Sequence, residues 1–118
     1  DILDFHDFYA RYGVIPVVLK ELLQRSDVVT LHVPLDDSTL NILSAERLGL
    51  MKHTAVLINA ARGGLVDEKV VKMMLMEKRL AAAAFAVFST EPPDDKDLLA
   101  LPNFLATPHI GGSAVYLQ

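Results

Sequence analysis

The chain has 118 residues, of which 52% are apolar and 22% are charged, and its formal net charge is −4. This length supports one domain with a buried core, or a piece of a larger domain. A negative net charge without a cluster of Lys or Arg argues against a nucleic-acid surface. No apolar run approaches the roughly 18 residues of a membrane span, so we expect no membrane partner.

The sequence contains no cysteine, which excludes disulfides and thiolate metal sites. No signal peptide is recognisable, because the chain opens with Asp1, Asp4 and Asp7 where such a peptide has a basic region. Both features agree with a cytoplasmic location. The chain also starts without Met, so we expect it to be part of a longer protein.

Helix-type and strand-type patterns alternate along the chain. In order, the expected elements are a helix over 1–12, a helix over 17–25, a strand over 28–33, a helix from the N-cap Ser44 to about Met51, a strand over 54–58, a helix over 68–79 capped by Asp67, a strand over 80–88, a helical turn over 97–101 and a strand over 103–106. Short links between alternating helices and strands are typical of βαβ units. The fold class is therefore α/β, and we predict a parallel sheet with helices on both faces.

The methionines and His6 are not expected to bind a ligand. Met73, Met74 and Met76 fall within the expected helix over 68–79, where we expect them to fill gaps in the core. His6 is expected to face solvent on the first helix, since no second metal-type residue has matching spacing. We expect no metal site.

The stretch over 56–67 organises the chain. A short apolar run, the mark of a buried strand, is followed by a turn of small residues that contains Arg62 and two glycines. Ligands of open α/β sheets bind at the carboxyl ends of the strands. A guanidinium there suits a substrate carboxylate. The alternative is an arginine that only hydrogen-bonds loop carbonyl groups.

Glu91 and His109 follow the next two expected strands. Histidine suits proton transfer near neutral pH, and a neighbouring carboxylate favours its protonated form. With Arg62 as the cation for an anionic substrate, the three side chains form a workable catalytic set. The alternatives are a structural histidine between Pro and Ile, and a glutamate that belongs to a proline-rich turn.

Four sequence motifs, taken in chain order, resemble motifs of a known protein family. The segments over 26–35, 59–68, 86–93 and 107–113 resemble the second half of the cofactor domain of the D-isomer-specific 2-hydroxyacid dehydrogenases. The similarity covers essentially the whole chain. It implies a partial Rossmann-like, doubly wound parallel sheet. It also implies that residues 1–118 are the C-terminal portion of a dinucleotide-binding domain, without its first βαβ unit and without the substrate domain.

The resemblance implies an oxidoreductase that transfers a hydride between NAD(H) and a small D-2-hydroxy acid or 2-keto acid. The family's catalytic residues fall on Arg62, Glu91 and His109. His109 would then protonate the 2-keto oxygen, Glu91 would hold His109, and Arg62 would bind the substrate carboxylate. The longer protein would be a homodimer, as family members commonly are.

The resemblance also implies a set of cofactor-binding residues. Asp1 falls where the family often has an acidic residue that bonds both ribose hydroxyls, which favours NAD over NADP; the alternative is a frayed terminal residue. The backbone around residues 33–34, 60–61 and 111–112 would line the dinucleotide. The full set is Asp1, Val33, Pro34, Ala60, Ala61, Arg62, His109, Gly111 and Gly112.

Two features depart from the family pattern. Ala86 stands where the family usually has an Asp that contacts the nicotinamide carboxamide. The chain also contains no G-x-G-x-x-G motif for the pyrophosphate. We therefore expect the isolated chain to bind NAD poorly and to be inactive. The alternative function is a non-catalytic, dehydrogenase-fold NAD-binding regulatory protein of the corepressor type.

Overall fold

The computed structural model describes residues 17–91 and 93–107 of the chain. The expected helix over 1–12, Asp1 and the loop with His109, Gly111 and Gly112 lie outside the described residues. Within those two ranges, no helix combines the length and the apolar character that crossing a bilayer requires.

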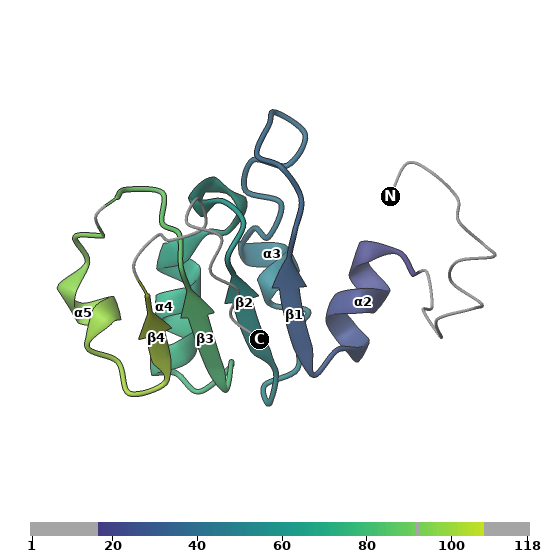
Figure 1. Ribbon diagram of the computed structural model, residues 1–118. Helices are drawn as coiled ribbons and strands as arrows, with labels where there is room; N and C mark the ends of the chain where they lie inside the picture. The colour runs from purple at the N-terminus through teal and green to yellow at the C-terminus, as the bar shows by residue number, and fades with distance from the viewer. Residues whose placement is uncertain (1–16, 92, 108–118) are drawn as a thin grey trace.

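In residues 17–91 and 93–107, four parallel strands form one sheet, in the order in which they occur along the chain (Figure 1). The strands are β1 (Val28–Leu31), β2 (Val56–Asn59), β3 (Ala82–Phe85) and β4 (Phe104–Ala106). Since all four run in the same direction, their carboxyl ends lie at one edge, the upper edge in Figure 1, together with the loops that follow β1, β2 and β3. The predicted parallel α/β sheet is confirmed.

Within the described part of the chain, five helical segments connect and flank the strands. They are α2 (Leu19–Arg25), α3 (Ala45–Leu48), the 3-10 turn η1 (Gly63–Leu65), α4 (Glu68–Met76) and α5 (Lys96–Leu99). The predicted caps are confirmed, because the side chain of Ser44 accepts from the Arg47 N–H and that of Asp67 accepts from the Val70 N–H. In Figure 1, α3 and α4 lie behind the sheet, α2 lies beyond β1 and α5 lies beyond β4.

The sheet is buried on the side of its helices. In β1, Val29 and Leu31 are buried while Val28 and Thr30 are exposed, and β2 and β3 alternate in the same phase between buried and half-buried residues. Among the described residues, the helical cover lies on this one face. Helices on the second face stay a prediction.

Several expected elements are shorter than predicted. The strand expected over 28–33 ends at Leu31, and the helix expected to reach about Met51 ends at Leu48. The strand expected over 80–88 spans only Ala82–Phe85, because the chain then bends and buries Val87 and Phe88 in succession, which a strand with alternating faces does not allow. The Phe88 ring packs 5.9 Å from that of Phe85. Helix α4 ends at Met76 instead of near residue 79, since Lys78 takes a left-handed backbone conformation with φ of 58°.

The expectation that methionines fill the core is wrong for two of them. Met73 and Met76 are 47% and 61% exposed, whereas Met74 is buried together with Val71 and Leu75. Helix α4 directs this second group of side chains into the core, and the half-buried Val70 packs against it. Met73 and Met76 fall on the opposite side of the helical wheel and therefore face outward.

An ion pair joins α4 to α5. Lys72 Nζ lies 3.0 Å from Asp95 Oδ1 and 3.2 Å from Asp95 Oδ2, and Oδ1 also accepts from the Leu98 N–H as the N-cap of α5. The hydrogen bond from Leu98 and the neighbouring Lys72 hold the pKa of Asp95 below its ordinary value of 3.8. This contact fixes the start of α5 against α4.

Replacing Asp95 with Asn is expected to keep the cap, because an amide oxygen also accepts from the Leu98 N–H, but to remove the ion pair with Lys72. Since folding lowers the pKa of Asp95, the stabilisation by its carboxylate is complete above the ordinary pKa and is lost as the pH falls through the lower folded value. Asp95→Asn should therefore unfold at a lower temperature at about pH 6, and the difference should shrink below about pH 4.

Thermal unfolding at low ionic strength measures this difference, because salt screens an ion pair of this kind. A gap between the two proteins that stays constant from neutral to acid pH would contradict the role given to Asp95.

Candidate functional site

The turn after β2 is held from inside the protein by Asn59. This residue is fully buried at the end of the strand, where its Nδ2 donates to the Arg62 carbonyl at 2.9 Å and its Oδ1 accepts from the Ala61 N–H at 3.2 Å. Sequence reasoning missed this role. The available signal was an Asn directly after an apolar run, a residue type that often bonds the backbone of its own turn.

The side chain of Arg62 lies on the outside of the same turn. It is exposed, and its Nη1 donates to the Ala61 carbonyl at 2.7 Å. In this structure Arg62 therefore makes the bond to a loop carbonyl that the sequence analysis gave as the alternative to substrate binding. That bond uses one of the five N–H groups of the guanidinium, so the side chain retains the capacity to bind a carboxylate.

Gly63 brings this turn into contact with the loop after β3. A Cβ atom at position 63 would lie 2.0 Å from the carbonyl carbon of Phe88 and 2.4 Å from the nitrogen of Ser89. The two backbones therefore approach more closely than any side chain permits. As a result, the turn with Arg62 and the loop with Glu91 are in direct contact.

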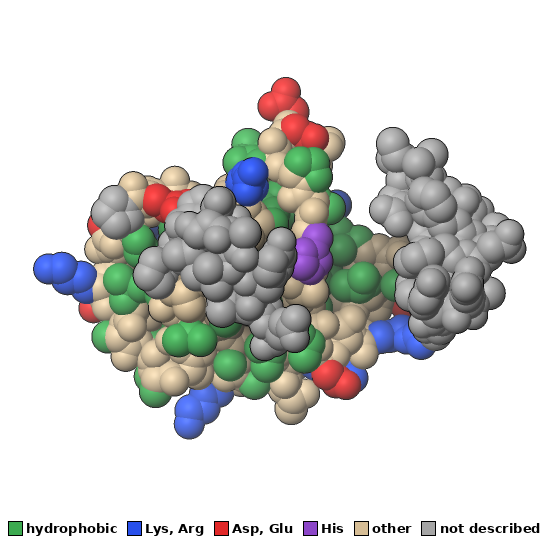
Figure 2. Space-filling model, viewed as in Figure 1, with side chains coloured by type: hydrophobic (Ala, Val, Ile, Leu, Met, Phe, Trp, Pro, Cys, Tyr) green, Lys and Arg blue, Asp and Glu red, His purple; other side chains and the backbone are tan. Residues whose placement is uncertain are grey.

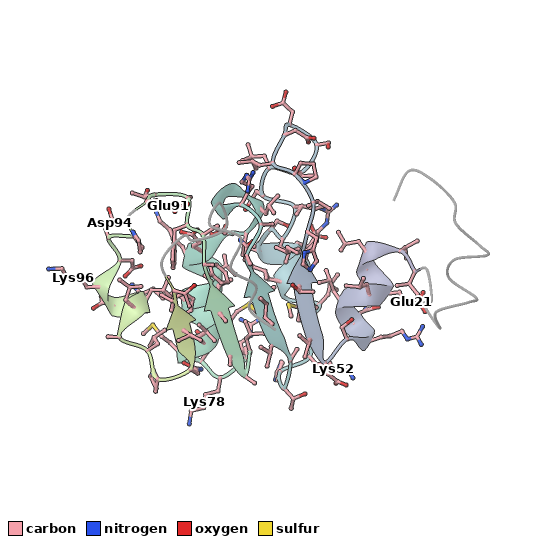
Figure 3. The ribbon with its side chains drawn as sticks, viewed as in Figure 1. Glu21, Lys52, Lys78, Glu91, Asp94 and Lys96 are labelled. Carbon is pink, nitrogen blue, oxygen red and sulfur yellow. The ribbon has the colours of Figure 1, made fainter. Side chains whose placement is uncertain are left out.

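Glu91 lies at the carboxyl edge of the sheet. Figure 3 shows it there, whereas Lys52 and Lys78 lie at the opposite edge. The Glu91 side chain is exposed, and its Oε2 accepts from the Phe88 N–H at 3.4 Å. The structure thus places two of the three expected catalytic side chains on adjoining segments, while His109 lies outside the described residues.

A second carboxylate, Glu68, accompanies Glu91. Its Oε2 accepts from the Ser89 N–H at 2.8 Å and its Oε1 accepts from the Ser89 hydroxyl at 3.0 Å. Burial raises the pKa of Glu68, the bonds from Ser89 oppose this, and the nearby charges of Glu91 and Asp67 raise it further. Sequence reasoning treated Glu68 only as the start of a helix, since nothing local indicates a contact with a residue 21 positions later.

The loop after β1 carries the expected cofactor residues Val33 and Pro34, both exposed. The Thr39 hydroxyl donates to the Pro34 carbonyl at 2.6 Å, and Asp36 accepts from both the N–H and the hydroxyl of Ser38. These hydrogen bonds, chiefly that from the Ser38 side chain, lower the pKa of Asp36. In Figure 2 the tip of this loop carries acidic side chains above the sheet.

The β1 loop is tied to the turn after β2. The Asn41 N–H donates to the Gly64 carbonyl at 2.7 Å and the Leu43 N–H donates to the Leu65 carbonyl at 3.0 Å. Ala60 is exposed and Ala61 is half-buried in the same turn. Val33, Pro34, Ala60, Ala61, Arg62 and Glu91 thus share one edge of the sheet, while Asp1, Gly111 and Gly112 lie outside the described residues.

This edge offers a cation, Arg62, to a small anionic ligand, with the carboxylate of Glu91 on the adjoining loop. No group of three His, Cys, Asp or Glu side chains capable of holding a metal ion occurs in the described part of the chain. A cavity of about 310 Å³ lies nearby, between the start of α4, the β3 loop and α5. Its lining includes Glu68 and Ser89 but neither Arg62 nor Glu91.

Comparisons with known proteins agree on one family. The model of the family described as "D-isomer specific 2-hydroxyacid dehydrogenase, NAD binding domain" matches residues 5–111. The D-3-phosphoglycerate dehydrogenase of Methanocaldococcus jannaschii is 48% identical over 100 residues, which are 85% of this chain and 19% of that protein. The glyoxylate reductase of Korarchaeum cryptofilum is 41% identical over 115 residues, covering 97% of this chain and 35% of that protein.

The fold agrees as well. The solved structure of a D-lactate dehydrogenase from Sporolactobacillus sp. superposes with a TM-score of 0.81 at 41% identity, covering 94% of this chain and 37% of that one. In each of these three comparisons the chain spans well under half of the matched protein.

Proposed function

Because the chain belongs to the D-isomer specific 2-hydroxyacid dehydrogenase family through its NAD-binding domain, we propose that it acts within an oxidoreductase for small D-2-hydroxy acids and 2-keto acids. It would form the C-terminal portion of the dinucleotide-binding domain of a longer protein. The contact between the turn with Arg62 and the loop with Glu91, at the carboxyl edge of the sheet, carries this proposal.

The proposed chemistry needs three side chains. Arg62 binds the carboxylate of the keto acid and polarises the adjacent carbonyl. Glu91 holds His109 in its protonated form, and His109 gives its proton to the 2-keto oxygen. A bound nicotinamide supplies the hydride. In the reverse direction His109 accepts the proton of the hydroxyl group.

The family implies a nicotinamide dinucleotide as cofactor. We propose that exposed backbone at Val33, Pro34, Ala60 and Ala61, together with Gly111 and Gly112, lines it. The described loops fit this role because their backbones meet at one edge of the sheet. Similar solved structures include one with NAD+ and three with NADP or NADPH, and our proposal of NAD rests on Asp1.

The test is an assay of the full-length protein that carries this chain. We expect it to reduce a small 2-keto acid such as glyoxylate or hydroxypyruvate with NADH, and more slowly with NADPH, whereas the 118-residue chain alone should be inactive. A full-length protein that binds no nicotinamide dinucleotide and reduces no 2-keto acid in a broad panel would overturn the proposal.

One observation favours a second function, a non-catalytic NAD-binding regulator. Ala86 is half-buried beside the turn after β2, where its N–H donates to the Asn59 carbonyl, but its methyl group can bond no carboxamide. Activity gained by Ala86→Asp in an otherwise inert protein would assign the defect to this position. NAD binding without activity in both proteins would favour the regulator. A homodimer and a cytoplasmic location stay predictions.

A further inference from the structure

The loop that carries Glu91 is fastened at several points. We call residues 86–91 and 93–95, between β3 and α5, the Glu91 loop. At its start, the Phe88 backbone lies against Gly63 of the turn after β2. At its end, the ion pair between α4 and α5 fixes the start of α5. Between these points Ser89 is bound by Glu68, the first residue of α4.

The contact with Glu68 is bidentate and lies two residues before Glu91. Each carboxylate oxygen of Glu68 accepts one hydrogen bond from Ser89, one from its N–H and one from its hydroxyl. Two bonds to one residue fix both the position and the orientation of the backbone there. The direction in which the chain continues to Glu91 is set at this point.

The arrangement is not explained by the stability of α4. An acidic side chain in the first turn stabilises a helix while remaining in solvent. The carboxylate of Glu68 is instead half-buried and lies near the charges of Glu91 and Asp67, and both effects raise its pKa. A charged Glu68 in this place therefore carries an electrostatic cost.

We propose that Glu68 is a positioning residue, whose bidentate contact with Ser89 holds the Glu91 loop so that Glu91 stays at the carboxyl edge of the sheet. This inference rests on the proposed function of Glu91. Glu68 itself touches neither substrate nor cofactor. Its effect on the reaction passes through the Ser89 backbone to the group that orients His109.

The test compares three variants of the full-length protein. Glu68→Ala removes both bonds to Ser89. Glu68→Gln keeps an acceptor for the Ser89 N–H and a donor for its hydroxyl, but removes the charge. Glu77→Ala is the matched control, because Glu77 lies at the other end of α4 and makes an exposed contact of 3.4 Å with Arg79. Each is examined by amide hydrogen exchange of the Glu91 loop and by steady-state kinetics.

In Glu68→Ala we expect exchange at Ser89 to be about tenfold faster or more, and kcat to fall by a similar factor. The unfolding temperature should stay near that of the parent, because the relief of burial and of charge repulsion offsets the lost hydrogen bonds. The KM for the dinucleotide should also stay near that of the parent, because Glu68 does not contact the cofactor in this proposal. Glu68→Gln should recover most of the exchange protection and of kcat. The control should match the parent in all measurements.

Unchanged exchange at Ser89 in Glu68→Ala would overturn the inference, whatever the activity. So would faster exchange with full kcat, or a loss of kcat that follows a lower unfolding temperature. The exchange measurement needs no turnover, so it still decides the contact if the protein reduces no keto acid. In that case it is the proposed function, tested by the substrate panel, that has failed.

Discussion

Replacing Gly63 with Ala is expected to destabilise the protein by about 3 kcal/mol or more and to abolish its activity. The new Cβ would lie 2.0 Å from the carbonyl carbon and 2.1 Å from the carbonyl oxygen of Phe88. These are backbone atoms, so relief requires moving either the turn with Arg62 or the Glu91 loop. Denaturant unfolding of the full-length protein, read with a probe local to this domain, measures the loss.

Gly49→Ala is the matched control for this substitution. Gly49 has a helical φ of −65°, and a Cβ there would lie 3.4 Å from its nearest neighbour, the Glu46 carbonyl oxygen, which is ordinary contact. This variant should be neutral or more stable by up to about 1 kcal/mol, since alanine restricts the unfolded chain. Equal stability of the two variants would show that the two loops do not meet as described.

Arg62→Gln is expected to lower kcat/KM for the keto acid by about 100-fold or more, because it removes a charged, two-pronged contact with the substrate carboxylate. Stability should hardly change, since the Arg62 side chain is exposed and, among the described residues, hydrogen-bonds the adjacent Ala61 carbonyl. Arg62→Lys should recover only part of the activity, because an ammonium lacks the planar fork. Steady-state kinetics with saturating NADH provide the measurement.

Arg79→Gln serves as the control. Arg79 is also an exposed arginine, but it precedes β3 and so belongs to the amino-end edge of the sheet, where its contact is with Glu77. It should keep full activity. Substantial keto-acid reduction by Arg62→Gln would remove the proposed substrate anchor. Comparing Arg62→Gln with Gly63→Ala distinguishes the roles of these adjacent residues. Arg62 is proposed to bind the substrate, whereas Gly63 allows the two loops of the site to meet.

Patterns within single segments were sufficient to predict much of the fold. The alternation of helices and strands led to the parallel sheet, and Ser44 and Asp67 marked two helix starts that the structure confirms. Arg62 and Glu91 were selected because polar residues after parallel strands emerge at the same edge. The outward-facing Met73 and Met76 were misjudged, since composition alone does not tell which side of α4 meets the sheet.

The local sequence determined the type and order of the elements, because apolar periodicity, caps and turn residues act over a few positions. The tertiary structure alone decided which loops meet. The contact of Gly63 with Phe88, and that of Glu68 with Ser89, join residues that are far apart in the chain. Such pairs form only when the parallel register places the turn after β2 beside the loop after β3. No sequence pattern within either segment indicates which segment lies next to it.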